Sequence, residues 1–220
     1  MTDNEIFKHI DHTLLKATSN WADIQKLCDE AIQYNTASVC VPPSYIARIH
    51  NNYPQINICT VIGFPLGYNT TEIKTAEVRQ AIADGANEVD MVVNLGDVKN
   101  GDFEKVTNEI AALKSAADKH ILKVIIETCY LTEEEKIKLC HCVSQAGADY
   151  IKTSTGFGTG GATIEDIELF KANIDKNVKM KAAGGVKSKD DLEKFLQAGC
   201  ERIGTSSAIA ILSGAKAKEY

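Results

Sequence analysis

The chain has 220 residues, and its hydrophobic content of 44% and charged content of 25% are ordinary for a globular domain. Its formal net charge of -6 argues against nucleic-acid or anionic-membrane partners, because those surfaces bind clustered lysine and arginine. No apolar run reaches the roughly 18 residues of a membrane-spanning helix. The N-terminus lacks the pattern of a secretory signal, so we expect a cytoplasmic protein with reduced cysteines.

Short strands rich in valine and isoleucine alternate with helical segments along the chain. In chain order, the predicted strands are Ile10–Leu15, Ala37–Val41, Asn57–Gly63, Glu88–Val93, Leu122–Glu127, Tyr150–Thr153, Val178–Ala182 and Arg202–Gly204. The segments between them carry helix signals, such as the capping box Thr132–Glu135. Eight alternations within one domain, residues 1–220, predict an α/β protein with a (β/α)8 TIM-barrel fold; an open doubly wound sheet is the alternative.

One layout recurs three times: a helix ends at a glycine, a short loop follows, and five residues after the glycine stands a residue unlike its neighbours. The glycines and these residues are Gly85 and Asp90, Gly147 and Lys152, and Gly199 and Gly204. Repeated βα units place such positions at similar heights, toward the carboxyl ends of the strands. Active sites of TIM barrels form at that end.

Two lysines and an aspartate stand in strands that are otherwise apolar. Lys152 ends its strand, and a buried lysine is costly unless it is paired or uncharged, so we interpret it as a nucleophilic amine that forms an imine with a carbonyl substrate. Lys179 and Lys181 share a face of their strand, and the glycine turn that follows favours Lys181 because it lies nearer the carboxyl end. Asp90 needs a cationic partner, and with Lys181 it is a candidate for proton transfer.

Glycine-containing turns follow the last two predicted strands and precede helices. Backbone N–H groups in such turns bind phosphate, and TIM barrels often bind phosphate between these two loops. The candidate phosphate-binding residues are Gly184, Gly185, Gly204, Ser206 and Ser207. The glycines between residues 156 and 161 do not have the spacing of a dinucleotide fingerprint, so we expect no nucleotide cofactor.

A metal site is not expected. The one metal-like run is Cys140-His141-Cys142, and it falls within a predicted helix, where residues i and i+2 point to different faces.

Five motifs in one order resemble those of the deoxyribose-phosphate aldolases of the short bacterial type. They are Ile10–Lys16, Val61–Gly67, Glu88–Val93, Ile151–Gly158 and Lys181–Val186. The resemblance implies a class I, metal-independent aldolase without a cofactor. Such an enzyme interconverts 2-deoxy-D-ribose 5-phosphate with D-glyceraldehyde 3-phosphate and acetaldehyde, in deoxynucleoside catabolism.

The resemblance also implies roles for individual residues. It places the Schiff-base lysine at Lys152, the proton-transfer pair at Asp90 and Lys181, an aspartate near these lysines at Asp11, and an auxiliary tyrosine at Tyr220. It assigns phosphate binding to the glycine and serine residues of the two turns named above.

This chain departs from longer members of the family at Phe157, where they carry a lysine near the phosphate, and Lys187 is a candidate substitute. A different phosphosugar lyase or isomerase, and a non-catalytic phosphometabolite-binding barrel, remain as alternatives. The expected partner is a small phosphosugar, and the sequence leaves open whether the chain forms a homo-oligomer, either a dimer or a tetramer.

Overall fold

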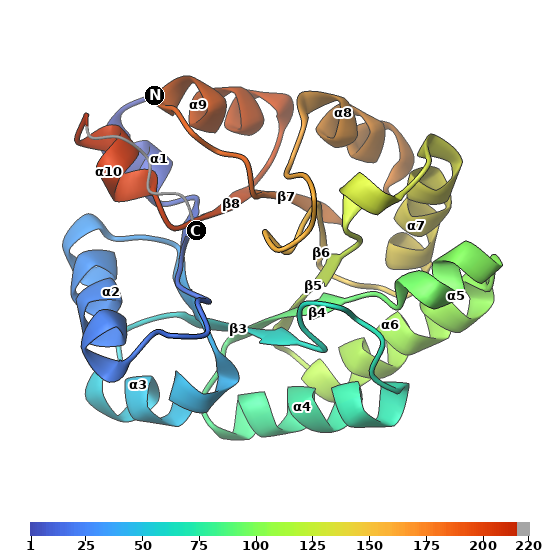
Figure 1. Cartoon of the computed structure of the whole chain (residues 1–220), viewed down its shortest axis with the longest axis horizontal. Helices are drawn as coiled ribbons and strands as arrows, with labels where there is room; N and C mark the ends of the chain where they lie inside the picture. Colours follow the sequence, from blue (N-terminus) through green and yellow to red (C-terminus); the bar gives the residue numbers. More distant parts are fainter. Residues whose placement is uncertain (215–220) are drawn as a thin grey trace.

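The computed structural model describes residues 1–214, and its centre is a closed barrel of eight parallel strands in chain order (Figure 1). The predicted (β/α)8 fold is therefore confirmed, and the open sheet is excluded. The strands are β1 Ile10–Thr13, β2 Ser38–Val41, β3 Ile58–Ile62, β4 Glu88–Val92, β5 Ile121–Ile125, β6 Tyr150–Lys152, β7 Lys179–Ala183 and β8 Arg202–Thr205.

Helices surround the barrel and cover the outer face of the strands (Figure 1). They are α1 Asp3–Phe7, α2 Trp21–Tyr34, α3 Ile46–Asn52, α4 Thr71–Ala83, α5 Leu95–Asn100, α6 Phe103–Ala117, α7 Glu133–Gln145, α8 Ile164–Asn173, α9 Lys189–Ala198 and α10 Ala208–Leu212, with short 3-10 turns at Pro43–Tyr45 and Thr128–Tyr130. Within residues 1–214, none of these helices has the length and apolar character that crossing a membrane requires.

Local signals in the sequence set the ends of several helices. Thr132 and Glu135 form the predicted capping box at the start of α7, and Ser188 and Thr163 accept hydrogen bonds at the starts of α9 and α8. The glycines that follow α4, α7 and α9 all have positive φ, between 73° and 113°. Glycine adopts this conformation without a steric penalty, so each helix stops there and the chain turns into the next strand.

The main apolar core lies between the helices and the outer face of the barrel. In α6 the stripe Val106, Ile110, Leu113 and Ala117 is buried against the sheet, as the helical spacing predicts. The barrel interior differs, because alternate residues of several strands place charged side chains there. Asp11, Asp90, Lys123 and Lys181 are each 0% exposed. TIM-barrel interiors are normally filled by branched apolar residues, so these buried charges are a departure that calls for a functional explanation.

Candidate active site

Seven charged side chains meet inside the barrel and form what we call the interior charge cluster. Its members are Asp11, Glu88, Asp90, Lys123, Lys152, Lys181 and Arg202. The strand register brings them together: Lys152 lies beside Lys181 on the next strand, and Asp90 lies beside Lys123. Three carboxylates thus face four basic groups in a space from which the protein excludes most water.

Asp90 is the centre of this cluster. One of its oxygens, Oδ2, accepts hydrogen bonds from Lys152 Nζ at 2.7 Å and from Lys181 Nζ at 2.8 Å. Its other oxygen, Oδ1, accepts a hydrogen bond from Lys123 Nζ at 2.8 Å. The structure therefore brings Asp90, Lys152 and Lys181 together, and the sequence had singled out all three. Two lysines that share one carboxylate oxygen are close enough to exchange a proton through it.

Asp11 reaches the same cluster from β1. Its Oδ2 forms an ion pair with Lys181 Nζ, and its Oδ1 accepts hydrogen bonds from Arg202 and from Ser38 Oγ, the latter at 2.8 Å. Asp11 therefore contacts Lys181 but not Lys152 within residues 1–214. Such an arrangement holds Lys181 between two carboxylates, Asp11 and Asp90.

Three members of the cluster were missed from the sequence: Lys123, Glu88 and Arg202. Lys123 Nζ lies 2.5 Å from Glu88 Oε2, and Arg202 links Glu88 to Asp11. Lys123 stands in an apolar strand as Asp90 does, so the same signal was present in the sequence. Of these three, Lys123 contacts Asp90 directly, and Glu88 and Arg202 connect Lys123 to Asp11.

The cluster shifts the pKa values of its members apart. Burial by itself raises the pKa of the Asp90 carboxyl, but the charges of Lys123, Lys152 and Lys181 outweigh burial and hold that pKa well below its usual range. Burial lowers the pKa of Lys181, but the Asp11 and Asp90 carboxylates outweigh it, so the pKa of Lys181 is raised. At neutral pH Asp90 is therefore an anion and Lys181 a cation.

A cavity of about 220 Å³ opens at the carboxyl ends of the strands, directly above the cluster. Among the described residues, Lys152 is the cluster member that lines it. The rest of the lining includes all five candidate phosphate-binding residues, Gly184, Gly185, Gly204, Ser206 and Ser207. The structure thus places the predicted nucleophile and the predicted phosphate turns on the walls of one cavity.

The turn after β7 has a backbone that only glycine adopts readily. Gly184 and Gly185 have φ values of 75° and 76°. Gly161, from the loop after β6, packs so closely on this turn that a Cβ added to it would lie 2.4 Å from the carbonyl carbon of Gly184. No side chain fits between these two loops, so backbone atoms form this wall of the cavity.

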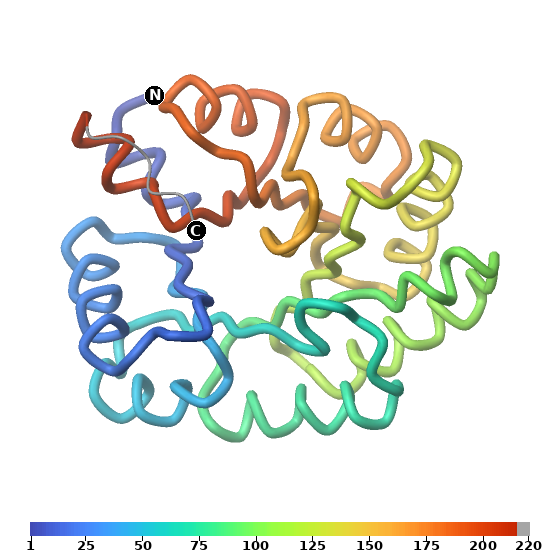
Figure 2. Tube along the Cα trace, viewed as in Figure 1, coloured from blue at the N-terminus to red at the C-terminus, as the bar shows by residue number. Residues whose placement is uncertain are grey.

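The loop after β6 curves over the open end of the barrel (Figure 2). A buried carboxylate that the sequence did not single out, Glu127, holds this loop: it accepts hydrogen bonds from the Thr155 N–H at 3.1 Å and from the Thr155 hydroxyl. The Thr155 hydroxyl in turn accepts a hydrogen bond from the Phe157 N–H at 3.0 Å. Glu127 itself has φ of 55°, an uncommon conformation for a residue with a side chain. Glu127 therefore fixes the cavity wall formed by Thr155 and Phe157.

Other sequence predictions have clear structural outcomes. Lys179 is exposed at the opposite end of the barrel, where it pairs with Glu201 at 2.8 Å, so the preference for Lys181 over Lys179 agrees with the geometry. Phe157 and Lys187 both line the cavity. Phe157 also packs edge-to-face against Phe64, with ring centroids 5.3 Å apart. Tyr220 lies outside the described residues.

Two groups of side chains within residues 1–214 have the spacing of metal ligands. They are Cys40, Cys59 and Asp90, and Asp11, Cys59 and Glu88. The carboxylates of both groups already bind lysine or arginine at 2.8 Å or less. Those cations repel a metal ion, so the charge distribution disfavours metal binding at either place.

Comparison with known proteins decides the family. Residues 6–215 match the family described as DeoC/LacD family aldolase. The chain belongs to this aldolase family. A protein from Clostridium botulinum (strain Alaska E43 / Type E3), named deoxyribose-phosphate aldolase, is 63% identical over 221 residues and covers 100% of both chains. A protein of the same name from Clostridioides difficile (strain 630) is 57% identical over 216 residues, covering 98% of this chain and 99% of the relative.

A solved structure agrees with the sequence relatives. The deoxyribose phosphate aldolase from Aeropyrum pernix, described as a tetramer, superposes with a TM-score of 0.88 at 30% identity, covering 97% of this chain and 92% of the other. The predictions of an aldolase, a lyase, and of a resemblance to deoxyribose-phosphate aldolases are confirmed.

Proposed function

We propose that this aldolase reversibly cleaves 2-deoxy-D-ribose 5-phosphate to D-glyceraldehyde 3-phosphate and acetaldehyde through a Schiff base on Lys152. The observation that carries the proposal is the position of Lys152, which lies between a cavity with phosphate-type turns and the carboxylate of Asp90. The names of the relatives supply the substrate. A role in deoxynucleoside catabolism and a cytoplasmic location stay predictions.

Lys152 is the basic group of the cluster that contacts the fewest carboxylates within residues 1–214. Lys181 and Arg202 each contact two carboxylates, and Lys123 contacts three, whereas Lys152 contacts Asp90 alone within residues 1–214. When Lys152 loses its proton, three basic groups remain to face three carboxylates, so the cluster stays balanced. The neutral amine that remains is the form that attacks a carbonyl.

The proposed cleavage begins when the Lys152 amine attacks C1 of the open-chain sugar and water leaves, which forms an iminium. The iminium withdraws electrons, so loss of the proton from the C3 hydroxyl breaks the C2–C3 bond and releases glyceraldehyde 3-phosphate. The enamine left on Lys152 is protonated on carbon and hydrolysed to acetaldehyde. Asp90 and Lys181 pass the protons, because Asp90 Oδ2 contacts both lysines.

The phosphate occupies the other end of the cavity in this proposal. The N–H groups of the Gly184-Gly185 turn and the hydroxyls of Ser206 and Ser207 bind it, and Lys187 supplies the positive charge that longer relatives place at the position of Phe157. Phosphate binding is remote from the reacting carbons, so it orients the sugar on Lys152. We further propose a homo-oligomer, because the Aeropyrum pernix relative is described as a tetramer.

Borohydride trapping tests the proposal. The full chain is treated with acetaldehyde or deoxyribose 5-phosphate, reduced with borohydride, and its peptides are mapped by mass spectrometry. We expect one ethyl adduct on Lys152 with acetaldehyde, and none in Lys152→Met. The matched control is Lys179→Met, which removes an exposed lysine from the strand that carries Lys181 and keeps the adduct. An adduct on Lys181, or no adduct together with no release of glyceraldehyde 3-phosphate, contradicts the proposal.

A further inference from the structure

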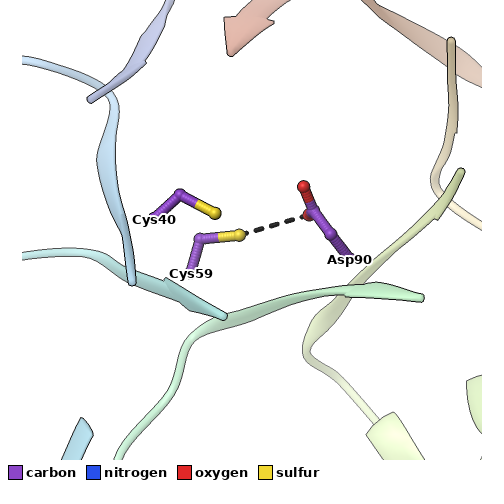
Figure 3. A group of neighbouring side chains, drawn as sticks. All are labelled: Cys40, Cys59 and Asp90. Atoms are coloured by element: carbon purple, nitrogen blue, oxygen red, sulfur yellow. Dashed lines mark hydrogen bonds between the residues drawn. The ribbon is translucent and has the colours of Figure 1, made fainter. Parts of the chain in front are cut away.

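Two cysteines face each other inside the barrel, beside the central aspartate. Cys40 comes from β2 and Cys59 from β3, and the two residues are direct partners in the strand register. Figure 3 shows that both thiols point toward Asp90. The two sulfur atoms and a carboxylate oxygen of Asp90 all lie within 4.8 Å of one another. The mechanism proposed above uses neither cysteine.

The backbone places this pair at a separation that suits a disulfide. Neighbouring strands lie about 4.8 Å apart, and disulfides join residues whose Cα atoms are roughly 4.4–6.8 Å apart. Both side chains point to the concave side of the barrel, where curvature brings the Cβ atoms of adjacent strands closer together. We propose that Cys40 and Cys59 are a redox pair: a small peroxide that enters the cavity oxidises them to a disulfide, which lowers the aldolase activity until a thiol reduces it.

A path for a small oxidant leads from the cavity to Cys40. Thr13 and Leu15 line the cavity. Thr13 is the register partner of Cys40 on β1, and Leu15 packs against the apolar group that contains both cysteines. One layer of side chains therefore separates the cavity from the thiols, and rotation of Leu15 gives a molecule of the size of hydrogen peroxide access to them.

The two thiols differ in a way that suits stepwise oxidation. The contact with the Cys59 thiol and the charges of Lys181 and Lys152 lower the pKa of Cys40, while burial and the charge of Asp90 raise it. Burial raises the pKa of Cys59 well above its usual value. Of the two thiols, Cys40 therefore loses its proton more readily and reacts first, and Cys59 is the thiol that resolves the product.

The reaction balances with peroxide as the only oxidant. The Cys40 thiolate attacks one peroxide oxygen, the O–O bond breaks, and the leaving hydroxide takes up a proton to become water, which leaves a sulfenic acid on Cys40. The sulfur of Cys59 then attacks the sulfur of Cys40. The S–O bond breaks, and the hydroxide leaves as water with the proton of Cys59. Two thiols and one peroxide thus give one disulfide and two waters.

Disulfide formation changes the contacts of Asp90. In the reduced protein Cys59 Sγ donates a hydrogen bond to Asp90 Oδ1 at 3.2 Å, and Lys123 Nζ donates one to Cys59 Sγ at 3.3 Å. A disulfide sulfur carries no proton, so Asp90 loses this donor. We expect kcat to fall about 10- to 100-fold, the size of a lost hydrogen bond to a charged group. The loss of activity depends on the proposed function, whereas the formation of the disulfide does not.

Peptide mapping tests the pair directly. The reduced full chain is titrated with hydrogen peroxide, free thiols are alkylated, and the protein is digested without reductant. Cleavage after Tyr34 separates Cys28 from Cys40, and cleavage after Arg48 separates Cys40 from Cys59. We expect a peptide that links Cys40 to Cys59, which rises as kcat falls and disappears as dithiothreitol restores kcat.

Two variants sharpen the result. In Cys59→Ala the donor to Asp90 is already missing, so kcat is lowered before oxidation. The resolving thiol is missing too, so peroxide forms no linked peptide, Cys40 proceeds to the sulfinic acid, and dithiothreitol does not raise kcat. Cys129→Ser removes the cysteine that is partly exposed and should keep the reversible response of the unmodified chain. Oxidative inactivation without the Cys40–Cys59 link, or the link with kcat unchanged, overturns the proposal. A link in a chain without aldolase activity contradicts the proposed function instead.

Discussion

The barrel interior and the layer of helices around it both bury ion pairs of lysine and carboxylate, but the two regions differ in how many partners each charge has. Lys74 of α4 is 0% exposed and contacts one carboxylate, Glu109 of α6, at 2.9 Å. Its second hydrogen bond goes to the backbone carbonyl of Val92, at 2.9 Å. Inside the barrel, by contrast, Asp90 contacts three lysines and Lys181 contacts two carboxylates.

The two regions shift pKa values in opposite directions. In the helix layer burial dominates: it lowers the pKa of Lys74 and raises that of Glu109, and the single partner of each does not compensate. In the barrel the charges of several partners outweigh burial, so the pKa of Asp90 falls and that of Lys181 rises. One buried partner is enough to hold two helices together. In the barrel interior each charge has several partners, which hold it in place while a proton moves between Lys152, Asp90 and Lys181.

The largest expected effect distinguishes Lys152 of the barrel interior from Lys74 of the helix layer. Lys152→Met removes the amine that forms the imine, so we expect kcat to fall on the order of 10⁵-fold or more, as for other lost nucleophiles. Lys74→Met leaves the Glu109 carboxylate buried without a cation, and we expect it to cost about 3–5 kcal/mol of unfolding free energy with kcat of the folded protein unchanged. Steady-state kinetics and urea unfolding of both variants measure this difference. Equal losses of kcat would contradict it.

The next largest effect distinguishes Asp90 of the barrel interior from Glu109 of the helix layer. Asp90→Asn removes the group that passes protons between Lys152 and Lys181, so we expect kcat to fall about 10²- to 10⁴-fold, which is about 3–5 kcal/mol in the barrier. Glu109→Gln keeps the shape of the side chain in the helix layer and should change stability while kcat stays within about twofold. A pH profile of kcat adds a check, because it should change shape in Asp90→Asn and keep its shape in Glu109→Gln.

The sequence predicted the strand order of the barrel and the three central residues because each left a local signal. A charge inside an apolar strand marked Asp90, Lys152 and Lys181, and a repeated glycine set the strand starts. The same signal was present for Lys123, but its partner Asp90 lies on a different strand, and only the register between β4 and β5 shows that the two are neighbours.

Other residues carried no signal that sequence alone can use. Lys74 stands in a helix rich in polar residues, and nothing in its neighbourhood separates it from the exposed lysines of other helices; packing of α4 on α6 decides its burial. Glu127 follows an apolar strand and looks like a surface residue at a strand end. Its burial comes from the loop after β6, which folds back onto it from about thirty residues later.

Acid unfolding tests the opposite pKa shifts. A carboxyl whose pKa is lowered on folding, such as Asp11, stabilises the fold at pH values above 3.8, its pKa in the unfolded chain. This stability is lost as the pH falls through the lower pKa of the folded state. For one such aspartate the loss is on the order of 2–3 kcal/mol. Glu109 has a raised pKa, so it binds protons more tightly in the folded state and its cost is relieved as the pH falls toward 4.5.

Two variants should therefore change the pH dependence of the unfolding free energy in opposite directions. Between pH 5 and pH 2.5, the unfolding free energy of Asp11→Asn should fall less steeply than that of the unmodified chain. That of Glu109→Gln should fall more steeply near pH 4.5, because the relief at Glu109 is gone. Urea unfolding at a series of pH values measures both slopes, and a change of the same sign in both variants would refute the contrast between the two regions.

The smallest expected effect lies at the rim of the cavity, where a single buried carboxylate holds a loop rather than a proton. Glu127→Gln keeps an oxygen for the Thr155 N–H but weakens the hydrogen bond from the Thr155 hydroxyl. A hydrogen bond of this kind contributes about 0.5–1.5 kcal/mol, so we expect kcat/KM for deoxyribose 5-phosphate to fall about 2- to 12-fold. The adduct with acetaldehyde on Lys152 should form at an unchanged rate, because acetaldehyde has no phosphate for the cavity wall to orient. A slower adduct in Glu127→Gln would mean that this carboxylate acts on Lys152 itself, and the contrast between a proton-moving cluster and single structural carboxylates would then fail at Glu127.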